Sequence, residues 1–600
     1  MMTRALFACL VALVGVTASA QPAGNAHPET RMVTSDAAAD NLRHPFGRPV
    51  IRPTMTPTEK TAFAETVNLE PLRDLAVLHN GRVKIMDTLA RETVEQLTGR
   101  SRYFDLGEPD EDGRRPKLHH DPLFTLTDLA IDPGHYVDKP LISIGYLPLR
   151  RAMLEAVFPD DPDEVSAWMR LTRVAPAMIT AVGDEMWRRY EGQEAYRSAL
   201  TRTDQRLNLF EQSIGNWMLV APESADDVWH HLGEFPADSE IAAVTGRLGE
   251  AWRAGDAEST NAAIAELAAL LPTINAEQYP TTRRSLEQAY NQANAFEWGF
   301  WLYALSLVAL ILAFGTQRRW LAATGITLLV TATVMHGVGF TLRCIVAERF
   351  AIQNQFESMI GLSFFASVVG LVIMIGKRQW LFGAATAGAG FLVLVTATQT
   401  DMPGQNIERE AAILNTSVLL KYHVTTVLVS YGLIALGFVI SLFYLAAHYG
   451  AKLKGADAET VSLAAASVAP ETGRIVGDQS SAGTNAAKPS PKPRSLARTL
   501  ADLDTAHMAV LQLAFWTLGV GVLLGAWWAD HSWGRWWAFD PKETWALVTW
   551  IIYLIVIHLR LTGIKNKALV TAWLSVVGFF VMLWTYFGVN LLLPGLHAYA

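Results

Sequence analysis

The chain has 600 residues, 51% of them hydrophobic, and carries a net charge of −8. Its length allows several domains, and the mild acidic balance argues against a nucleic-acid partner. The charge is unevenly spread. Residues 21–297 hold 43 acidic and 28 basic side chains, whereas residues 298–600 hold 14 acidic and 20 basic ones. The sequence therefore predicts an acidic water-soluble half joined to a membrane half.

Residues 1–20 have the pattern of a secretory signal peptide. Arg4 supplies the positive end, residues 5–16 the apolar run, and Ala18-Ser19-Ala20 a small-residue cleavage site. An uncleaved anchor helix is the alternative, and both interpretations predict that the following residues are exported. The exported part contains no cysteine, so it has no disulfide and no CxxC motif of its own.

Residues 21–297 are predicted to form a mainly helical exported domain after a flexible lead-in. A turn at His79-Asn80-Gly81 is followed by a helix that Asp87 caps and that ends before Gly99. The segment HNGRVKIMDTLARETVEQLTG, residues 79–99, carries no recognisable chemistry.

Two pairs of adjacent histidines, His119-His120 and His230-His231, are the candidate metal ligands of this domain. Adjacent side chains point apart on a helix or strand, and no Cys/His spacing typical of zinc accompanies them. We therefore predict solvated surface histidines. No catalytic spacing occurs in this region.

The second half contains eight apolar runs, most of them near the ~20 residues that cross a bilayer. The predicted spans are residues 298–315, 320–342, 357–375, 380–398, 422–446, 507–528, 545–562 and 568–592. An all-α bundle follows, with five spans in residues 298–449, a flexible cytoplasmic linker at 450–505 and three spans in 506–600. The loops placed inside by an exported N-terminus are the basic ones, in agreement with the positive-inside rule. This predicts a multi-pass protein of the bacterial inner membrane.

Residues 527–550 run from the end of the sixth span into the seventh and contain seven tryptophans in 24 residues. The loop between these two spans lies on the external side of this topology. The tryptophans are Trp527, Trp528, Trp533, Trp536, Trp537, Trp545 and Trp550, and they surround the run Asp540-Pro541-Lys542-Glu543. Such an aromatic surface predicts a platform for a flat, apolar ligand. The alternative is an aromatic belt that only anchors the protein at the membrane interface.

His423 begins the fifth span and His597 follows the eighth, so both are predicted at the membrane face that carries the tryptophans. Two imidazoles beside an aromatic surface meet the minimum requirement for bis-histidine ligation of haem iron. Interfacial histidines among belt tryptophans are the open alternative. His558, 13 residues into the seventh span, fits a second, inner site or a packing contact, and His336 is predicted to pack or to hydrogen-bond.

Other polar residues near the span ends have simpler interpretations. His507 is predicted at the interface, and His531 is expected to be a bystander in the tryptophan stretch. Arg343, Arg535 or Lys542 would match a carboxylate, with a lipid headgroup as the alternative partner.

The segment WGRWWAFDPKETWALVTWIIYLIVIHLR, residues 533–560, resembles the tryptophan-rich "WWD" signature of haem-handling membrane proteins. It is most similar to the CcsA (ResC) family of System II cytochrome c biogenesis. DPKETW is the discriminating run, because the related CcmC and CcmF proteins carry the tryptophans but generally not these residues. LLKYHVTTVLVSYG and FGVNLLLPGLHAYA hold His423 and His597 where the family has its two external haem ligands, and IIYLIVIHLR holds His558 at its membrane histidine.

The resemblance covers about residues 298–600 and departs at Phe539, where the family usually has Trp. It implies that the chain binds haem b for cytochrome c biogenesis and presents it at the external face for thioether attachment to the CxxCH of apocytochrome c. The implied site consists of His423 and His597 on the iron, His558 at an inner site, and Trp527, Trp528, Trp533, Trp536, Trp537, Asp540 and Trp545 around the ring. No catalytic residue is assigned.

The resemblance also implies partners. These are a separate ResB (CcsB)-like membrane protein, apocytochrome c and a thioredoxin-like thiol reductant, and the chain would be a subunit of a haem lyase-like synthase. Two alternatives remain open at this point. One is a haem exporter or delivery component without ligation activity, and the other is a non-catalytic membrane assembly scaffold.

Overall fold

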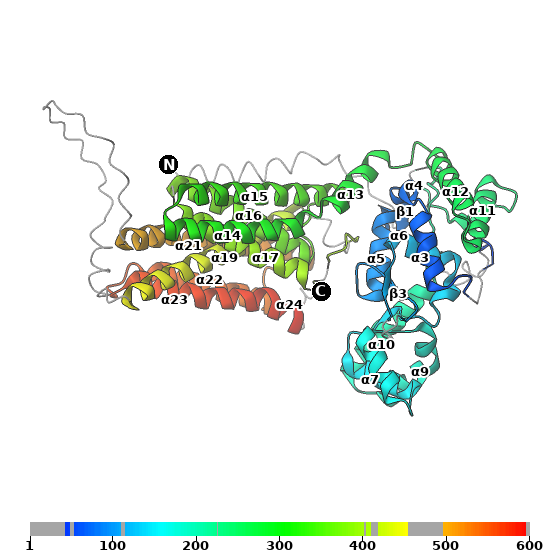
Figure 1. The fold of residues 1–600 in the computed structure, drawn as a ribbon. Helices are drawn as coiled ribbons and strands as arrows, with labels where there is room; N and C mark the ends of the chain where they lie inside the picture. Colours follow the sequence, from blue (N-terminus) through cyan, green and yellow to red (C-terminus); the bar gives the residue numbers. More distant parts are fainter. Residues whose placement is uncertain are drawn as a thin grey trace. The chain divides into compact units, whose positions relative to one another are not determined.

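The computed structural model describes residues 43–48, 53–109, 115–224, 226–377, 379–400, 402, 404–409, 418–453, 496–593 and 595. The chain divides between Gln292 and Ala293 into two compact units (Figure 1). The predicted signal peptide, most of the predicted lead-in, most of the linker and His597 lie outside the described residues.

The N-terminal unit is mainly helical, as predicted, and also contains three short antiparallel strand pairs. Its helices are α3 (Pro57–Thr66), α4 (Glu70–Arg73), α5 (Met86–Thr98), α6 (Pro122–Ile131), α7 (Leu147–Val157), α8 (Pro162–Leu171), α9 (Pro176–Arg189), α10 (Glu194–Glu211), α11 (Glu240–Ala254), α12 (Ala257–Leu270) and α13 (Thr281–Ala293). Single 3₁₀ turns are η1 (Pro133–Tyr136), η2 (Ser213–Asn216), η3 (Leu232–Glu234) and η4 (Leu271–Thr273). The strand pairs are β1–β2 (Ala76–His79, Arg82–Ile85), β3–β4 (Phe104–Leu106, Lys117–His119) and β5–β6 (Ile142–Ser143, Arg173–Val174).

The predicted turn after His79 joins β1 to β2. Asn80 and Gly81 have φ of 52° and 70°, the left-handed values that a two-residue type I′ hairpin turn requires. Helix α5 ends at Gly99, whose φ of 66° makes it the expected C-terminal cap. The predicted capping role of Asp87 is wrong. Its carboxylate lies in the first turn of α5 and pairs with Arg73 at 2.9 Å instead.

A buried ion network ties α3 to α6 in the centre of this unit. Lys60 Nζ lies 2.8 Å from carboxylate oxygens of both Asp128 and Asp132, and all three side chains are buried. Tyr136 and Trp252 donate further hydrogen bonds to Asp128, at 2.8 and 2.9 Å. Burial lowers the pKa of Lys60, but the two carboxylates outweigh burial and the pKa is raised. Each charge of the network is paired, although Oδ1 of Asp132 has no hydrogen-bond partner among the described residues, and this pairing lets the charges remain inside the fold.

Residues of the segment 79–99 also hold the last helix of the unit. Glu287 on α13 accepts hydrogen bonds from Arg82 at 2.9 Å and from Thr88 at 2.8 Å. Asn291, one turn further on, donates to Thr88 at 2.9 Å. The role of this segment is therefore structural: it fixes the helix that leads to the membrane half.

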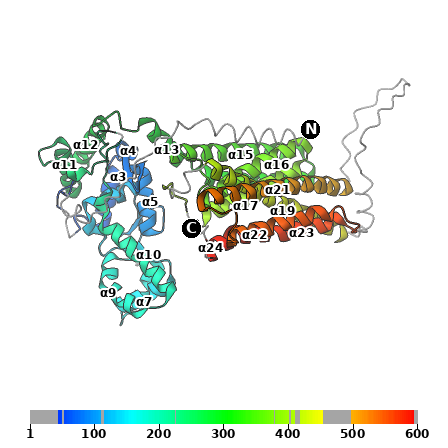
Figure 2. The same ribbon diagram turned by 180° about the vertical axis from the view of Figure 1, so that it is seen from behind.

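The second unit is a helical bundle. Among the described residues, eight helices are long and apolar enough to cross a membrane, which confirms the predicted class (Figure 2). Its helices are α14 (Ala295–Thr316), α15 (Arg319–Ala347), α16 (Gln355–Lys377), α17 (Trp380–Gln399), α19 (Val418–Leu453), α21 (Leu496–Trp533), α22 (Pro541–Leu559), α23 (Lys567–Leu583), the π-helical turn η5 (Trp584–Gly588) and α24 (Val589–Leu592).

Helices α16, α17 and α19 form the interior of the bundle, and α22 is the least covered of the spans described. Glycines let neighbouring helices of the bundle approach one another closely. A Cβ on Gly432 of α19 would lie 2.8 Å from the carbonyl oxygen of Leu362 on α16. Small residues at such contacts let membrane helices pack closely.

Two helices run further than hydropathy indicated. Helix α19 spans Val418–Leu453 and α21 spans Leu496–Trp533, so the first three tryptophans of the stretch are helical. Helix α22 ends at Leu559, which places His558 in its last turn rather than well inside the span.

Candidate functional site

The chain reverses direction between α21 and α22 within residues 534–540, which we call the tryptophan-rich turn. Gly534, at φ 70°, follows the last residue of α21. Asp540 then caps α22, and its carboxylate accepts a hydrogen bond from the backbone N–H of Lys542 at 3.3 Å. Glu543 completes a capping box by accepting from the backbone N–H of Asp540 at 3.2 Å. The run Asp-Pro-Lys-Glu is thus a helix start, with Pro at the first helical position.

Phe539 occupies an unusual position in this turn. Its φ is 57°, a left-handed conformation that bulky side chains rarely adopt, and its side chain is 79% exposed. Glu543 also accepts from the backbone N–H of Ala538 at 2.8 Å, so one carboxylate holds the backbone on both sides of Phe539. The turn therefore presents an aromatic ring outward at the cost of backbone strain, a feature that is common at functional sites.

The tryptophans of the stretch do not share one face. Trp528 is 3% exposed and packs edge-on against Trp533, with ring centroids 4.9 Å apart. Trp527 and Trp536 are 47% and 55% exposed. Trp537 lies against Phe539 in an edge-on contact. Part of the set supports the turn, and another part offers apolar surface to a ligand or to lipid.

A π-helical turn packs beneath this end of the bundle. Trp584, the first residue of η5, contacts Trp545 edge-on at 5.9 Å. Two residues later, Tyr586 donates to the carbonyl of Gln355, the first residue of α16, at 3.3 Å. Single π-turns inside α-helices occur frequently at functional sites.

His423 lies in the second turn of α19 and contacts the same end of α21. Its Nδ1 is 2.7 Å from the carbonyl oxygen of Gly521, and a carbonyl only accepts, so Nδ1 carries the proton. The ring packs against Gly525, where a Cβ would lie 2.4 Å from Cε1 of the imidazole. The imidazole therefore occupies the space that Gly525 leaves open on α21.

The C-terminal end of the chain returns to the tryptophan-rich turn. A Cβ on Gly595 would lie 2.6 Å from Oδ1 of Asp540, so the backbone at this point passes directly over the cap of α22. His597 follows two residues later and lies outside the described residues. The structure therefore places Gly595 against the side chain of Asp540.

His558 lies on the outer surface of α22. Its Nδ1 is 2.8 Å from the carbonyl of Leu554 in its own helix, and the side chain is exposed. As in His423, Nδ1 carries a proton, because a carbonyl only accepts. The imidazole faces away from the bundle formed by this chain.

The other two intramembrane histidines are structural. His336 is fully buried, with Nε2 2.9 Å from the carbonyl of Ile360, which confirms the predicted hydrogen bond. His507, predicted at the interface, is buried between helices. It is 2% exposed, and its Nε2 lies 3.0 and 3.1 Å from the hydroxyls of Ser441 and Ser575 on two other helices.

Arg343, one of the predicted carboxylate-binding residues, is occupied by the protein itself. It is fully buried and donates to the carbonyls of Gly404 and Gln405 at 2.7 and 2.8 Å. Glu357, also fully buried, pairs with Arg343 at 3.2 Å and with Arg349 at 3.0 Å. This triad fixes a loop, so Arg535 and Lys542 remain as the candidate cations of the site.

The N-terminal unit offers no constellation of this kind. No group of three His, Cys, Asp or Glu residues suited to a metal occurs among the residues the structure describes. Each histidine pair splits as adjacent residues should: His119 and His230 are accessible as predicted, whereas His120 and His231 are 2% and 1% exposed, contrary to the prediction.

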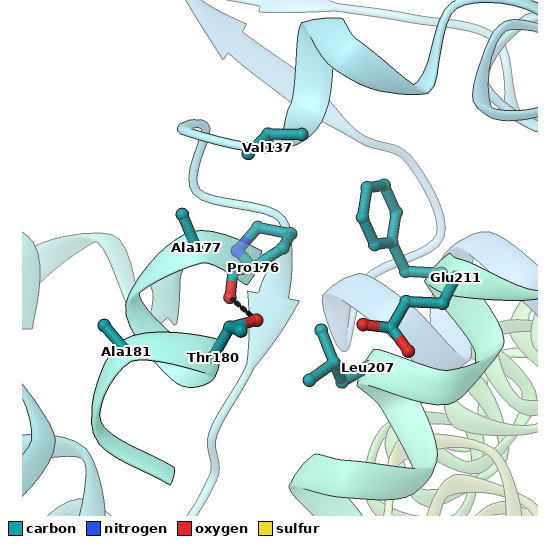
Figure 3. A pocket seen from close by; sticks show the side chains of 8 residues that line it. Val137, Pro176, Ala177, Thr180, Ala181, Leu207 and Glu211 are labelled. Atoms are coloured by element: carbon teal, nitrogen blue, oxygen red, sulfur yellow. Dashed lines mark hydrogen bonds between the residues drawn. The ribbon is translucent and has the colours of Figure 1, made fainter. Parts of the chain in front are cut away.

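A cavity of about 470 Å³ lies between α9, α10 and the turn at Val137 (Figure 3). Its lining is Val137, Pro176, Ala177, Thr180, Ala181, Leu207, Phe210 and Glu211. The hydroxyl of Thr180 is engaged with the carbonyl of Pro176 at 3.2 Å. The lining therefore provides one carboxylate on an apolar wall and no nucleophile with an adjacent base.

The fold and the site define a polytopic helical membrane protein with a tryptophan-rich turn at one end, beside an imidazole held in a single tautomer. The sequence model of the family described as cytochrome C assembly protein matches residues 294–597, and the N-terminal unit lies outside this match. The chain belongs to this family.

Several curated relatives are similar over the same half. The cytochrome c biogenesis protein CcsA of Synechococcus sp. (strain RCC307) is 30% identical over 311 residues, which cover 50% of this chain and 94% of the relative. The CcsA of Nostoc punctiforme is 30% identical over 320 residues, covering 47% of this chain and 89% of the relative. For the CcsA of Microcystis aeruginosa the identity is 32% over 273 residues, with 43% and 81% covered.

Proposed function

We propose that this chain acts in cytochrome c biogenesis by binding haem b at the tryptophan-rich end and presenting it for covalent attachment to apocytochrome c. Family membership and the names of the CcsA relatives support the role in biogenesis. The observation that carries the haem site is the geometry of His423, whose Nδ1 donates to Gly521 at 2.7 Å.

The chemistry of this histidine fits an axial ligand of haem iron. A metal-ligating histidine generally donates its other ring N–H to a carbonyl or carboxylate, which fixes the tautomer and the orientation of the ring. His423 makes this contact within the chain, and the ring is held against Gly525. His597, two residues past Gly595, is the proposed second ligand on the resemblance of the C-terminal segment.

Other residues of the tryptophan-rich end would position the haem. Exposed aromatic surface at Trp527, Trp536 and Phe539 suits the flat macrocycle. Arg535 or Lys542 would bind a propionate. When bound, haem supplies the vinyl groups to which the two thiols of CxxCH add. The chain's contribution is to hold and orient, and no residue is assigned a catalytic step.

Orientation follows from charge. Successive spans place the basic loops and the tryptophan-rich turn on opposite sides of the membrane. Cytoplasmic loops are the ones enriched in Lys and Arg. We therefore propose that the tryptophan-rich end and the N-terminal unit face the outside of the bacterial inner membrane. Residues 21–297 contain no cysteine, so a thioredoxin-like reductant would have to keep the thiols of the apocytochrome reduced.

A membrane partner is proposed for α22. This helix is the least covered of the described spans and carries His558 on its exposed side. A polar side chain in this location is costly against lipid and is usually matched by protein. A ResB-like membrane protein that covers α22 would shield His558, and the two proteins could share an inner haem site there.

The haem site is tested on the full-length protein purified in detergent. His423→Gly is expected to lose the Soret band of bound haem, and added imidazole is expected to restore it by filling the space of the missing ring. His531→Ala is the matched control, because His531 is an exposed histidine of the same stretch whose hydrogen bond among the described residues is to the carbonyl of Trp527. A His423→Gly protein that retains the wild-type spectrum would exclude His423 as a ligand.

Ligation is distinguished from delivery by a second measurement. The chain is co-expressed with the ResB-like partner and an apocytochrome, and covalent haem in the cytochrome is detected by its peroxidase activity after denaturing electrophoresis. Haem bound by the chain together with an absence of thioether product under all partner combinations would identify a delivery component instead. An absence of haem in the purified protein, with and without the partner, would favour an assembly scaffold.

A further inference from the structure

We propose that the N-terminal unit contains an oxyanion-binding site centred on Arg173, beneath the β3–β4 hairpin. The ligand would carry a carboxylate or phosphate group, the two oxyanions whose geometry matches a guanidinium bidentately. The proposal is independent of haem binding at the tryptophan-rich end.

Arg173 is a buried charge whose donors are unused. The residue lies in β6 and is fully buried, and none of its three guanidinium nitrogens has a hydrogen-bond partner among the described residues. Its Cζ lies 4.2 Å from the ring centre of Phe104 and 6.0 Å from that of Tyr103. Contact with the face of a ring stabilises the charge but leaves all five N–H bonds without acceptors.

A second unpaired donor lies beside it. The hydroxyl of Tyr103 is buried and also has no partner among the described residues. The carboxylate of Asp105, two residues from Tyr103, is already engaged, since it lies 2.7 Å from His135 and 3.7 Å from Lys139. The site thus offers an anion two kinds of hydrogen-bond donor, a guanidinium and a phenol, and no carboxylate of the described residues pairs with Arg173.

The surroundings are positively charged, although the N-terminal unit as a whole is acidic. Lys117 on β4 is exposed, and its Nζ lies 4.7 Å from the ring centre of Phe104. The pKa of Arg173 is lowered to about 10, chiefly by burial, with Tyr103 raising it and the charge of exposed Arg100 lowering it. A buried unpaired charge destabilises the fold, and an anionic ligand would offset this.

Short strand pairs cover the site. β3 and β4 are joined by three residue pairs, and β5 and β6 by two. Such small ladders open at low free energy compared with global unfolding, which gives an anion a route to a buried guanidinium. Binding would also stabilise these ladders, so the amide hydrogens of residues 103–106 and 173–175 would exchange more slowly.

The experiment is amide hydrogen exchange with mass spectrometry on the full-length protein in detergent. Inorganic phosphate and acetate are compared with sodium chloride at equal ionic strength. Exchange in these two peptides is expected to slow about tenfold when the anion is present at ten times its dissociation constant. An effect of phosphate alone or of acetate alone would identify which oxyanion the site takes.

Three variants separate the site from general salt effects. Arg173→Met removes the charge at similar length and is expected to abolish the anion effect without loss of folding, because apolar replacement of an unpaired buried charge is tolerated. Arg173→Lys keeps the charge but loses the planar fork, and the effect should weaken. Arg170→Met, on the exposed last turn of α8, is the control and should behave as wild type. Equal exchange of the wild type in all three salts, or an anion effect that survives Arg173→Met, would overturn the proposal.

Discussion

Substituting Gly525 by alanine should disable haem binding while leaving the bundle folded. The added Cβ would lie 2.4 Å from Cε1 and 2.8 Å from Nδ1 of His423. Non-bonded carbon atoms prefer separations of about 3.5–4.0 Å, so the imidazole has to move by roughly 1 Å. The 2.7 Å hydrogen bond to Gly521 would be lost, because that carbonyl belongs to a helix and cannot follow the ring. Displacements of ~1 Å in a reacting group can cost about 10²-fold in rate, and a similar loss of cytochrome maturation is expected.

The assay has two readouts, the Soret absorbance of the purified variant and the amount of covalent cytochrome c formed in cells. Circular dichroism checks that the helices remain. Gly450→Ala is the matched control, since Gly450 lies on the same helix as His423 and no atom lies within 4 Å of its added Cβ. If Gly525→Ala binds haem as the wild type does and matures cytochrome normally, the position of His423 does not control the site.

Three further predictions concern groups elsewhere in the chain. Glu357→Ala leaves Arg343 and Arg349 buried without their carboxylate, so the bundle should lose about 3–5 kcal/mol and residues 404–408 should exchange amide hydrogens faster. Burial lowers the pKa of His120 from 6.5 to about 4, so the unfolded state binds more protons between these values. The contribution of His120 to the stability of the N-terminal unit should therefore fall by roughly 3 kcal/mol between pH 6.5 and 4. The urea midpoint of His120→Phe, measured by tryptophan fluorescence, should depend less steeply on pH, with part of the dependence left to His44 and His79, whose pKa values burial also lowers to about 4. Asp540→Ala removes the cap of α22 and should cost about 1 kcal/mol, seen as faster exchange in the first turn of that helix. Unchanged exchange at residues 404–408, a parallel pH profile, or an unaltered first turn would contradict the respective prediction.

The number and type of elements in the membrane half could be predicted because a helix that crosses a bilayer needs a long run of apolar residues, and such runs are visible in the sequence. Helix ends could not, since a helix continues beyond its apolar stretch wherever the backbone remains hydrogen-bonded. Helix α21 accordingly runs through Trp533, past the predicted end at residue 528. The turn that follows was readable in principle, because Asp-Pro-x-Glu is a capping box with proline at the first helical position.

Side-chain roles were harder to predict because the partners come from distant parts of the chain. His507 bonds to serines on α19 and α23, and Arg343 binds the carbonyls of residues 404 and 405. No local sequence pattern indicates such contacts. The same holds for Arg173. Nothing in the sequence distinguishes it from other arginines, and its burial becomes visible only in the packing of β6 against Phe104.

The hydrogen bonds of the ring nitrogens separate the four intramembrane histidines described here into two kinds. His336 and His507 direct Nε2 at a carbonyl or at hydroxyls inside the bundle, so this nitrogen is used within the fold. His423 and His558 instead donate a hydrogen bond from Nδ1 to a carbonyl, the contact that a metal-ligating histidine generally makes with its other ring nitrogen. They differ in where the carbonyl lies. That of His423 belongs to another helix, so the packing of α19 on α21 orients the ring before any ligand arrives. That of His558 belongs to its own helix, and the ring points away from the bundle. A haem site at His423 can therefore be prepared by this chain, whereas one at His558 needs a partner to complete it.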